Sequence, residues 1–335
     1  FGGFMKEKIN YIDYSKGIAI LFVIFGHVYS GNNIATTWIY SFNMPLFFII
    51  SGFLLKLNKN KDTKSMILKK FKSLMVPYIL FSIINIVGFY LIKDLSYEVF
   101  KGNIFNTITL FGIGALWFLP ALFISETLFL FEKNNISKNK YKALFYISIV
   151  FIIAIFIFVS KGNYTNVIGK LTIVLVRSIV ALFFINIGYY LYKVISKINF
   201  KIYQILILIV ISIIFSILNG YVDLWGVQFN NLPLYVFNSI IGSLLIIAIT
   251  KKINGSKVLE FLGQNTLVIM ATHQLILEAI LKSSLIKYLN NIMIIFIILL
   301  LEYPLIKIIN KYLPFMLGKK REKSIINKEN NAVME

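Results

Sequence analysis

The stretch DYSKGIAILFVIFGHV, Asp13 to Val28, joins a run apolar enough to cross a lipid bilayer to two ionisable side chains, Lys16 and His27. Ten residues separate the lysine from the histidine, and none of them is charged. A transmembrane helix needs roughly 20 mostly apolar residues, and runs of about this length recur along the whole chain. The stretch therefore predicts a membrane-spanning helix that buries polar groups for a specific purpose.

The composition predicts an all-α, polytopic transmembrane helical bundle. Of the 335 residues, 58% are hydrophobic and only 14% are charged, whereas soluble domains carry about 25% charged residues. The apolar runs predict ten spans, which lie at about 12–30, 38–56, 73–92, 115–132, 143–160, 171–192, 200–218, 233–250, 258–280 and 292–312. The segment 103–115 is expected to be re-entrant or interfacial. We expect one membrane domain, residues 1–318, followed by a charged cytoplasmic tail, residues 319–335.

Basic residues alternate between the predicted connections. Seven lysines lie between positions 56 and 72, and the four even-numbered connections together hold 17 against 6 in the other five. Because basic residues favour the cytoplasmic side, both termini are expected to be cytoplasmic. The net charge of +20 is then explained by topology and by attraction to anionic lipid headgroups, so we expect the bilayer and not nucleic acid as the partner.

Several classes of site are not expected from the residue counts. The chain has no cysteine, which excludes disulfides, a cysteine nucleophile and thiolate metal sites. It has two histidines, too few for a histidine-rich metal centre, and no metal is expected. The first apolar segment lacks a small-residue cleavage site, so we do not expect a cleavable signal peptide.

Lys16 and His27 are predicted to share one face of the first helix. Eleven positions make almost three turns, so the two side chains lie about 16 Å apart along the axis. Lys16 is expected at the cytoplasmic mouth and His27 well inside the bilayer. The structural alternative for Lys16 is a snorkelling lysine paired with Asp13, and for a buried histidine it is packing against a neighbouring helix.

Other polar side chains interrupt the apolar spans. His273, in LGQNTLVIMATHQLIL, falls at a depth similar to that of His27, which predicts a shared polar site. Arg177 has no charged neighbour in its own span and needs a partner or an anionic ligand. Glu126 is a candidate partner for a histidine or for Arg177. Ser51, beside Gly52, fits a site role as well as it fits close helix packing.

Four motifs together resemble the acyltransferase-3 family of bacterial integral membrane acyltransferases. They are DYSKGIAILFVIFGHV, FNMPLFFIISGFLL (from Phe42), ALWFLPALF (from Ala115) and FLGQNTLVIMATHQLI (from Phe261), and they occur in the family's order over nearly the whole chain. The sequence is more similar to the stand-alone, fucose-acetylase-like members than to those fused to an extracytoplasmic domain. The resemblance implies O-acylation of a cell-surface or lipid-linked glycan, with acetyl-coenzyme A as acyl donor, in the bacterial cytoplasmic membrane.

The resemblance also implies roles for matching residues. The first-span histidine, His27, would be catalytic, and the basic residue before it, Lys16, would help to hold the acyl donor. Combining the resemblance with the buried polar residues predicts catalytic roles for His27, Ser51 and Glu126, contacts with the acyl donor for Lys16, Arg177 and Trp117, and contacts with the acyl acceptor for Asn43, His273 and Gln274. No carboxylate follows within several residues of His27, where some relatives have one, so the group that orients the imidazole stays open.

These predictions lead to direct transfer with His27 as general base, which is worth roughly 10²–10⁴-fold in rate. A covalent acyl-enzyme on His27, His273 or Ser51 is the mechanistic alternative. The competing functions are a transporter or flippase for a lipid-linked glycan and a membrane sensor or scaffold. The sequence leaves open the acceptor sugar, the length of the acyl group and whether the protein is a homo-oligomer.

Overall fold

The computed structural model describes residues 10–31, 33–57, 62–93, 96–136, 146–147, 150–151, 153 and 166–319. Within these residues the chain is helical, apart from turns, short loops and one isolated β-bridge between Asp223 and Gln228. The predicted all-α helical bundle is confirmed. The tail at 320–335 lies outside the described residues.

Eight helical segments are long and apolar enough to cross a membrane, counted over the described residues. They are Asn10–Val28, Ile34–Leu57, Thr63–Lys93, Gly114–Phe131, Val167–Lys197, Ile202–Asn219, Leu232–Thr250 and Asn291–Tyr312. They match eight of the ten predicted spans. The predicted fifth span, 143–160, lies mostly outside the described residues. The total number of spans and the side on which the termini lie stay predictions.

The helix ends follow from local capping chemistry. Several helices begin after a residue whose side-chain oxygen accepts a hydrogen bond from a backbone N–H of the first turn, which satisfies a group that has no partner within the helix. The capping residues are Asn33, Asp62, Asn166, Asn231, Ser256 and Asn290. The polar residues between the apolar runs therefore fix where each helix starts.

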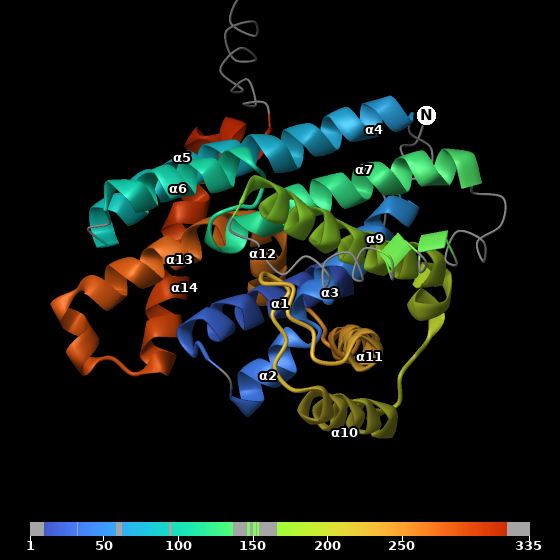
Figure 1. The fold of residues 1–335 in the computed structure, drawn as a ribbon. Helices are drawn as coiled ribbons and strands as arrows, with labels where there is room; N and C mark the ends of the chain where they lie inside the picture. Colours follow the sequence, from blue (N-terminus) through green and yellow to red (C-terminus); the bar gives the residue numbers. More distant parts are fainter. Residues whose placement is uncertain are drawn as a thin grey trace, which may run out of the picture.

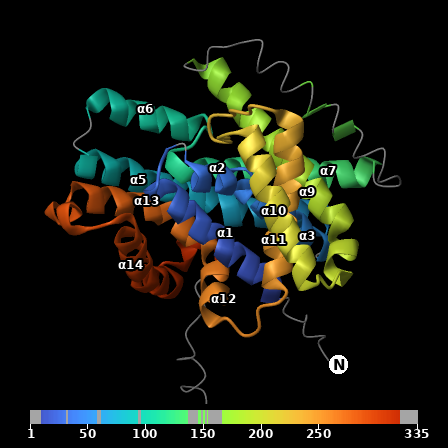
Figure 2. The same ribbon diagram turned by 90° about the horizontal axis from the view of Figure 1, so that it is seen from below.

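Helices α1 (Asn10–Val28) and α3 (Asn43–Leu57) form the centre of the bundle. In Figure 1, α13 (Thr266–Lys282) and α14 (Asn291–Tyr312) lie on one side of them. Helices α10 (Ile202–Asn219) and α11 (Leu232–Thr250) pack together elsewhere around the centre, and Figure 2 gives the second view. Helix α2 (Ile34–Tyr40) connects α1 to α3.

Helix α3 packs closely along α9 (Val167–Lys197) because small residues face each other. A side chain at Gly52 would collide with the backbone of α9 at Ile185, and one at Gly188 would collide with the backbone of α3 at Ile49. Such close approach strengthens packing between helices in a membrane. The Ser51-Gly52 pair thus serves close packing through the glycine, and this leaves the serine free to face a cavity.

The predicted ninth span, 258–280, is not one continuous helix. It consists of α12 (Lys257–Gln264) and α13, with a break at Asn265. A side chain at Gly263 would meet the backbone carbonyl of Asp13, and one at Gly17 would meet that of Leu259, so α12 lies directly on the beginning of α1. The break lets the chain follow α1 closely and then turn away, which the apolar pattern alone does not reveal.

The segment between the third and fourth predicted spans is built as a short helix and a tight turn. Before this segment, α4 (Thr63–Lys70) continues through a π-helical turn, Phe71–Met75, into α5 (Val76–Lys93). The short helix of the segment is α6 (Tyr97–Ile108), which packs beside α5. At 12 residues, α6 is too short to cross a bilayer. The following turn places Gly112 and Gly114 at positive φ and leads through a 3₁₀ turn, Gly114–Trp117, into α7 (Phe118–Ile136).

Candidate functional site

One stripe of α1 connects the two polar ends of the helix. Lys16 and Ile20 line one cavity, and Val23 and His27 line another. We call the cavity at His27 the outer cavity and the one at Lys16 the inner cavity, after the predicted orientation of the helix. The expected shared face of Lys16 and His27 is therefore present, but it faces two cavities. Lys16 also forms an ion pair with Asp13, at 2.7 Å.

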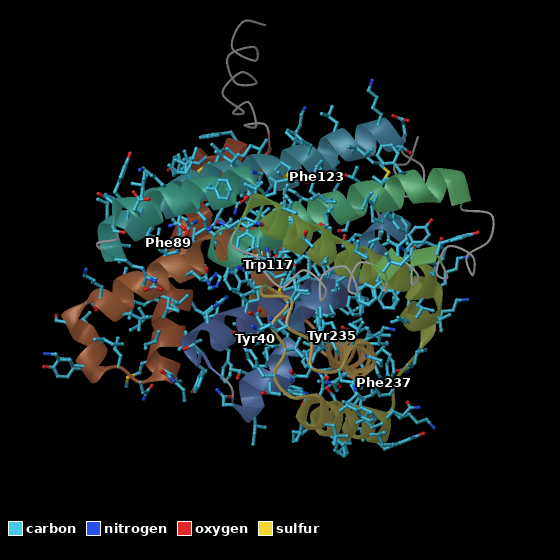
Figure 3. All side chains as sticks on the ribbon, in the orientation of Figure 1. Tyr40, Phe89, Trp117, Phe123, Tyr235 and Phe237 are labelled. Carbon is cyan, nitrogen blue, oxygen red and sulfur yellow. The ribbon has the colours of Figure 1, made fainter. Side chains whose placement is uncertain are left out.

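The outer cavity has a volume of about 380 Å³, within the range of roughly 300–1,000 Å³ for small-molecule sites. It brings together four predicted residues from four different elements, namely His27, Asn43, Trp117 and Gln274. Tyr40, which also lines it, and Trp117 are labelled in Figure 3. The loop at 220–231 contributes further lining residues, including Asp223 and Trp225.

Gln274 is the group that orients the His27 ring. The backbone N–H of Ala115 donates to Gln274 Oε1 at 2.8 Å, which turns the amide nitrogen toward the imidazole. That nitrogen lies 3.1 Å from His27 Nδ1 and 3.3 Å from Nε2. An amide N–H can only donate, so it meets a ring nitrogen that carries a lone pair. The contact favours a neutral imidazole, whose single lone pair then accepts the Gln274 N–H.

Gly114 makes this contact possible. Its φ is +50°, and a side chain there would collide with Gln274 Oε1. Glycine allows both the backbone conformation and the close approach of the amide. The tight turn before Trp117 thus positions Gln274, and through it His27.

His273 lies directly behind His27. It is fully buried, and the centroids of the two rings are 5.2 Å apart. His273 Nδ1 donates to the carbonyl of Ile269 at 2.7 Å, which leaves the lone pair on Nε2. Nε2 has no hydrogen-bond partner among the described residues. The predicted pairing of the two histidines is therefore present, with His273 buried behind His27 while Gln274 reaches the cavity.

Arg177 supports the wall of the outer cavity. Its Nε donates to the carbonyl of Trp225 at 2.9 Å and its Nη1 to that of Phe111 at 2.8 Å, and Nη2 also contacts the Trp225 carbonyl. The guanidinium lies 5.0 Å from the centre of the Trp117 ring. Arg177 is 1% exposed. Its N–H groups thus hold backbone carbonyls of two segments, and the contact with the acyl donor stays a prediction.

The loop held by Arg177 carries a carboxylate that the sequence reasoning did not select. Asp223 Oδ1 accepts the backbone N–H of Trp225 at 2.8 Å. The backbones of Asp223 and Gln228 pair in both directions, at 3.2 and 2.8 Å. Burial raises the pKa of the Asp223 carboxyl above its ordinary value, opposed by the backbone N–H groups of Trp225 and Gly226 and by the Arg177 guanidinium. The loop therefore holds one oriented acidic group on the cavity wall.

The inner cavity, of about 170 Å³, holds the other predicted residues. Ser51 donates to Glu126 Oε1, and Lys70 Nζ lies 2.6 Å from the same oxygen. Glu126 is fully buried and its Oε2 has no partner among the described residues. Ser51 and Glu126 are thus brought together with Lys16 and Lys70 and away from the cavity of His27. Glu126 is the partner of Lys70, not of a histidine or of Arg177.

Four apolar residues that line the inner cavity are the nearest along their elements to residues of the outer cavity. On each of the four shared elements, a residue of the inner cavity lies within about one helical turn of a residue of the outer cavity. We call this set the dividing layer, and it consists of Ile20, Phe47, Phe118 and Met270. The rings of Phe47 and Phe118 lie 5.7 Å apart. The two cavities therefore follow one another along the same path through the bundle.

Three polar residues near these cavities were missed by the sequence reasoning. Lys70 was grouped with the lysines that set the topology, and Asp223 lies in a loop without a motif. Glu302 lies inside α14, is 1% exposed, and has its Oε1 2.7 Å from the hydroxyl of Thr272, the neighbour of His273. An acidic residue inside an apolar span is itself a signal of function, so Glu302 was recognisable from the sequence.

The fold is that of a polytopic helical membrane protein, and one of its two polar cavities is lined by a histidine that Gln274 contacts. The family model that describes an acyltransferase domain matches residues 9–307, nearly the whole chain. The chain belongs to the acyltransferase-3 family and is a membrane acyltransferase. No curated protein and no solved structure gave a match.

Proposed function

We propose that this protein transfers an acetyl group from cytoplasmic acetyl-coenzyme A to a hydroxyl of a cell-surface or lipid-linked glycan in the bacterial cytoplasmic membrane. The observation that carries the proposal is the arrangement of His27. Its ring faces a cavity of suitable size, the amide of Gln274 contacts the ring, and a lysine-lined cavity follows on the same helices.

The chemistry follows from the neutral imidazole. His27 accepts the proton of the sugar hydroxyl while the hydroxyl oxygen attacks the thioester carbonyl. The new C–O ester bond forms, the C–S bond breaks, and the thiolate of coenzyme A leaves with the proton returned from the imidazolium. General-base catalysis of this kind contributes roughly 10²–10⁴-fold. Gln274 donates to that lone pair before substrate binds, so the sugar hydroxyl must displace the Gln274 N–H before His27 can accept its proton.

The inner cavity suits the acyl donor because its charged groups are mostly basic. Lys16 and Lys70 both line it, and ammonium groups bind phosphates through charge-assisted hydrogen bonds. Lys16 holds the anionic end of the donor, as the resemblance implies, and Lys70 adds a second positive charge. Glu126 and Ser51 keep Lys70 directed into the cavity, which makes them positioning residues for the acyl donor in this scheme.

The acetyl group must cross the dividing layer to reach His27. Phe47 and Phe118 lie in van der Waals contact range across this layer, so transfer requires the two rings to separate. Opening would join the cavities into one path along α1. A layer that closes again behind the acyl group also keeps water from the thioester, which prevents wasteful hydrolysis.

The proposal is tested by the release of coenzyme A from acetyl-coenzyme A in proteoliposomes that contain a lipid extract of bacterial membranes as the source of the glycan acceptor. Because the chain has no cysteine, a thiol reagent detects only the released coenzyme A. His27→Ala is expected to lower the rate by about 10²–10⁴-fold, whereas Ser30→Ala, at an exposed position just beyond α1, should keep it. A flippase would release no thiol, and mass spectrometry of the surface glycan should show acetyl groups only with the active protein.

Two results would contradict the proposal. One is a His27→Ala variant that retains most of the wild-type rate. The other is a surface glycan whose acetylation does not depend on the protein. A labelled acetyl group that stays covalently on the purified protein without acceptor would replace direct transfer by an acyl-enzyme, without changing the overall reaction.

A further inference from the structure

Two polar side chains of the outer cavity, Asn43 and Asp223, bring oxygen acceptors to its wall. Asn43 is 2% exposed, and its Oδ1 has no hydrogen-bond partner among the described residues. The carboxylate of Asp223 adds a charged acceptor. A buried acceptor without a partner is costly, so this set of atoms favours a ligand that presents several hydrogen-bond donors.

No lysine or arginine is found among the described residues that line the outer cavity. Arg177 is near, but its guanidinium binds the carbonyls of Trp225 and Phe111 and does not line the cavity. The one fully charged group on the wall is therefore Asp223. In a partly desolvated site, a carboxylate repels another anion, so a phosphate or a carboxylate on the ligand would meet repulsion with no compensating cation.

Aromatic side chains form much of the remaining wall. Tyr40, Trp117, Tyr221 and Trp225 all line the cavity. The rings of Tyr40 and Tyr221 meet edge to face at 5.5 Å, and Trp225 is 44% exposed. Aromatic faces offer rigid apolar area beside polar groups. The apolar C–H faces of a sugar ring fit such a surface, while its hydroxyls reach the acceptors.

We infer that the outer cavity binds an uncharged, hydroxyl-rich sugar residue of the acyl acceptor, with Asp223 and Asn43 accepting hydrogen bonds from its hydroxyls and Asp223 excluding anionic sugars. This inference rests on the proposed function and specifies its acceptor. Arg177 acts on the sugar only through the loop, because it fixes the Trp225 carbonyl two residues beyond Asp223.

Binding can be measured without any acyl donor. The chain has three tryptophans, and two of them, Trp117 and Trp225, line the cavity. We would titrate the intrinsic fluorescence of the protein in nanodiscs of zwitterionic lipid with neutral trisaccharides of glucose, galactose, mannose and N-acetylglucosamine, and with anionic trigalacturonate.

At least one neutral trisaccharide should give a saturable change, with a Kd at least about 10-fold below that of trigalacturonate. Asp223→Asn keeps an oxygen for the Trp225 N–H, removes the charge and replaces the second acceptor oxygen by an amide NH2. This variant should raise the Kd of the neutral sugar by about 10-fold or more. The ratio between the Kd of trigalacturonate and the Kd of the neutral sugar should therefore decrease. Gln228→Ala, at an exposed position of the same loop, should change neither value.

Three outcomes would overturn the inference: tighter binding of trigalacturonate than of every neutral sugar, no saturable binding of any neutral sugar, or wild-type affinities in Asp223→Asn. The release of coenzyme A in the same nanodiscs reports separately on the proposed function. A protein that releases coenzyme A in a His27-dependent manner but fails the sugar titration keeps the proposed function and loses this assignment of the acceptor.

Discussion

The outer and inner cavities share four lining elements, which are α1, α3, α13 and the segment from Gly114 into α7. The charged residues that line the two cavities nevertheless differ. Two lysines and a carboxylate line the inner cavity, whereas one carboxylate and four aromatic residues line the outer cavity. An anionic acyl donor and an uncharged acyl acceptor are thus expected to select opposite ends of one path. In the proposed function, charge and not shape alone would assign each substrate to its side of the dividing layer.

The largest effect is expected from the charges of the inner cavity. In the double variant Lys16→Gln/Lys70→Gln, the KM for acetyl-coenzyme A should rise by about 100-fold, because each charge-assisted hydrogen bond to phosphate contributes about 1.5–3 kcal/mol. The affinity of the outer cavity for a neutral trisaccharide should not change. Lys69→Gln, at an exposed neighbouring position, is the control. If the double variant weakened the binding of acetyl-coenzyme A and of the neutral trisaccharide equally, the two cavities would not act separately.

The dividing layer should control leakage between the cavities. Phe118→Ala removes a ring that lies between them, so water should reach the thioester, and release of coenzyme A without any acceptor should increase by about 10-fold. Phe53→Ala also truncates a fully buried phenylalanine, but Phe53 lines neither cavity, and it should not increase this release. If Phe118→Ala leaves the acceptor-free rate unchanged, the acyl group does not pass this layer.

The smallest effect is expected from pH at the outer cavity. Since burial raises the pKa of Asp223, its charge is present above that pKa and is lost as the pH falls through it. The affinity for a neutral trisaccharide should therefore fall by up to about 10-fold on acidification below this pKa. The other ionisable groups around it are Arg177 on α9, Tyr40 on α2, Tyr235 on α11, Tyr221 in its own loop and His27 across the cavity.

Asp223→Asn is the reference for this measurement, because any pH dependence that remains in the variant comes from the other groups. A wild-type profile that coincides with that of the variant between about pH 4 and pH 8 would show that the Asp223 charge does not act on the ligand. Fluorescence titrations at each pH, without the acyl donor, provide both profiles.

The apolar pattern of the sequence predicted most of the long helices, but it did not predict where a helix breaks. Runs of about 20 apolar residues predicted eight spans that the structure contains, because a bilayer permits few alternatives to a helix. The break at Asn265 was missed because it depends on the contact of Gly263 with the backbone of α1. A contact between residues 250 positions apart leaves no local trace in composition.

The residues of the site were largely predictable, but their grouping was not. Ionisable residues inside apolar spans, such as His27 and His273, can be recognised from the sequence, since placing them in a membrane is costly. Their neighbours are decided by helix packing. Ser51 and Glu126 lie with Lys70, and Gln274 reaches His27 only because Gly114 and Ala115 hold its amide.

The sequence by itself determined a helical membrane protein with a lysine and a histidine on one face of its first helix, because hydrophobic length and helical period are local properties of the chain. Only the tertiary structure decided that this face meets two cavities, that Gln274 orients the histidine and that Arg177 holds a loop with Asp223. These features depend on contacts between distant segments, and such contacts are fixed by the packing of the helices against one another.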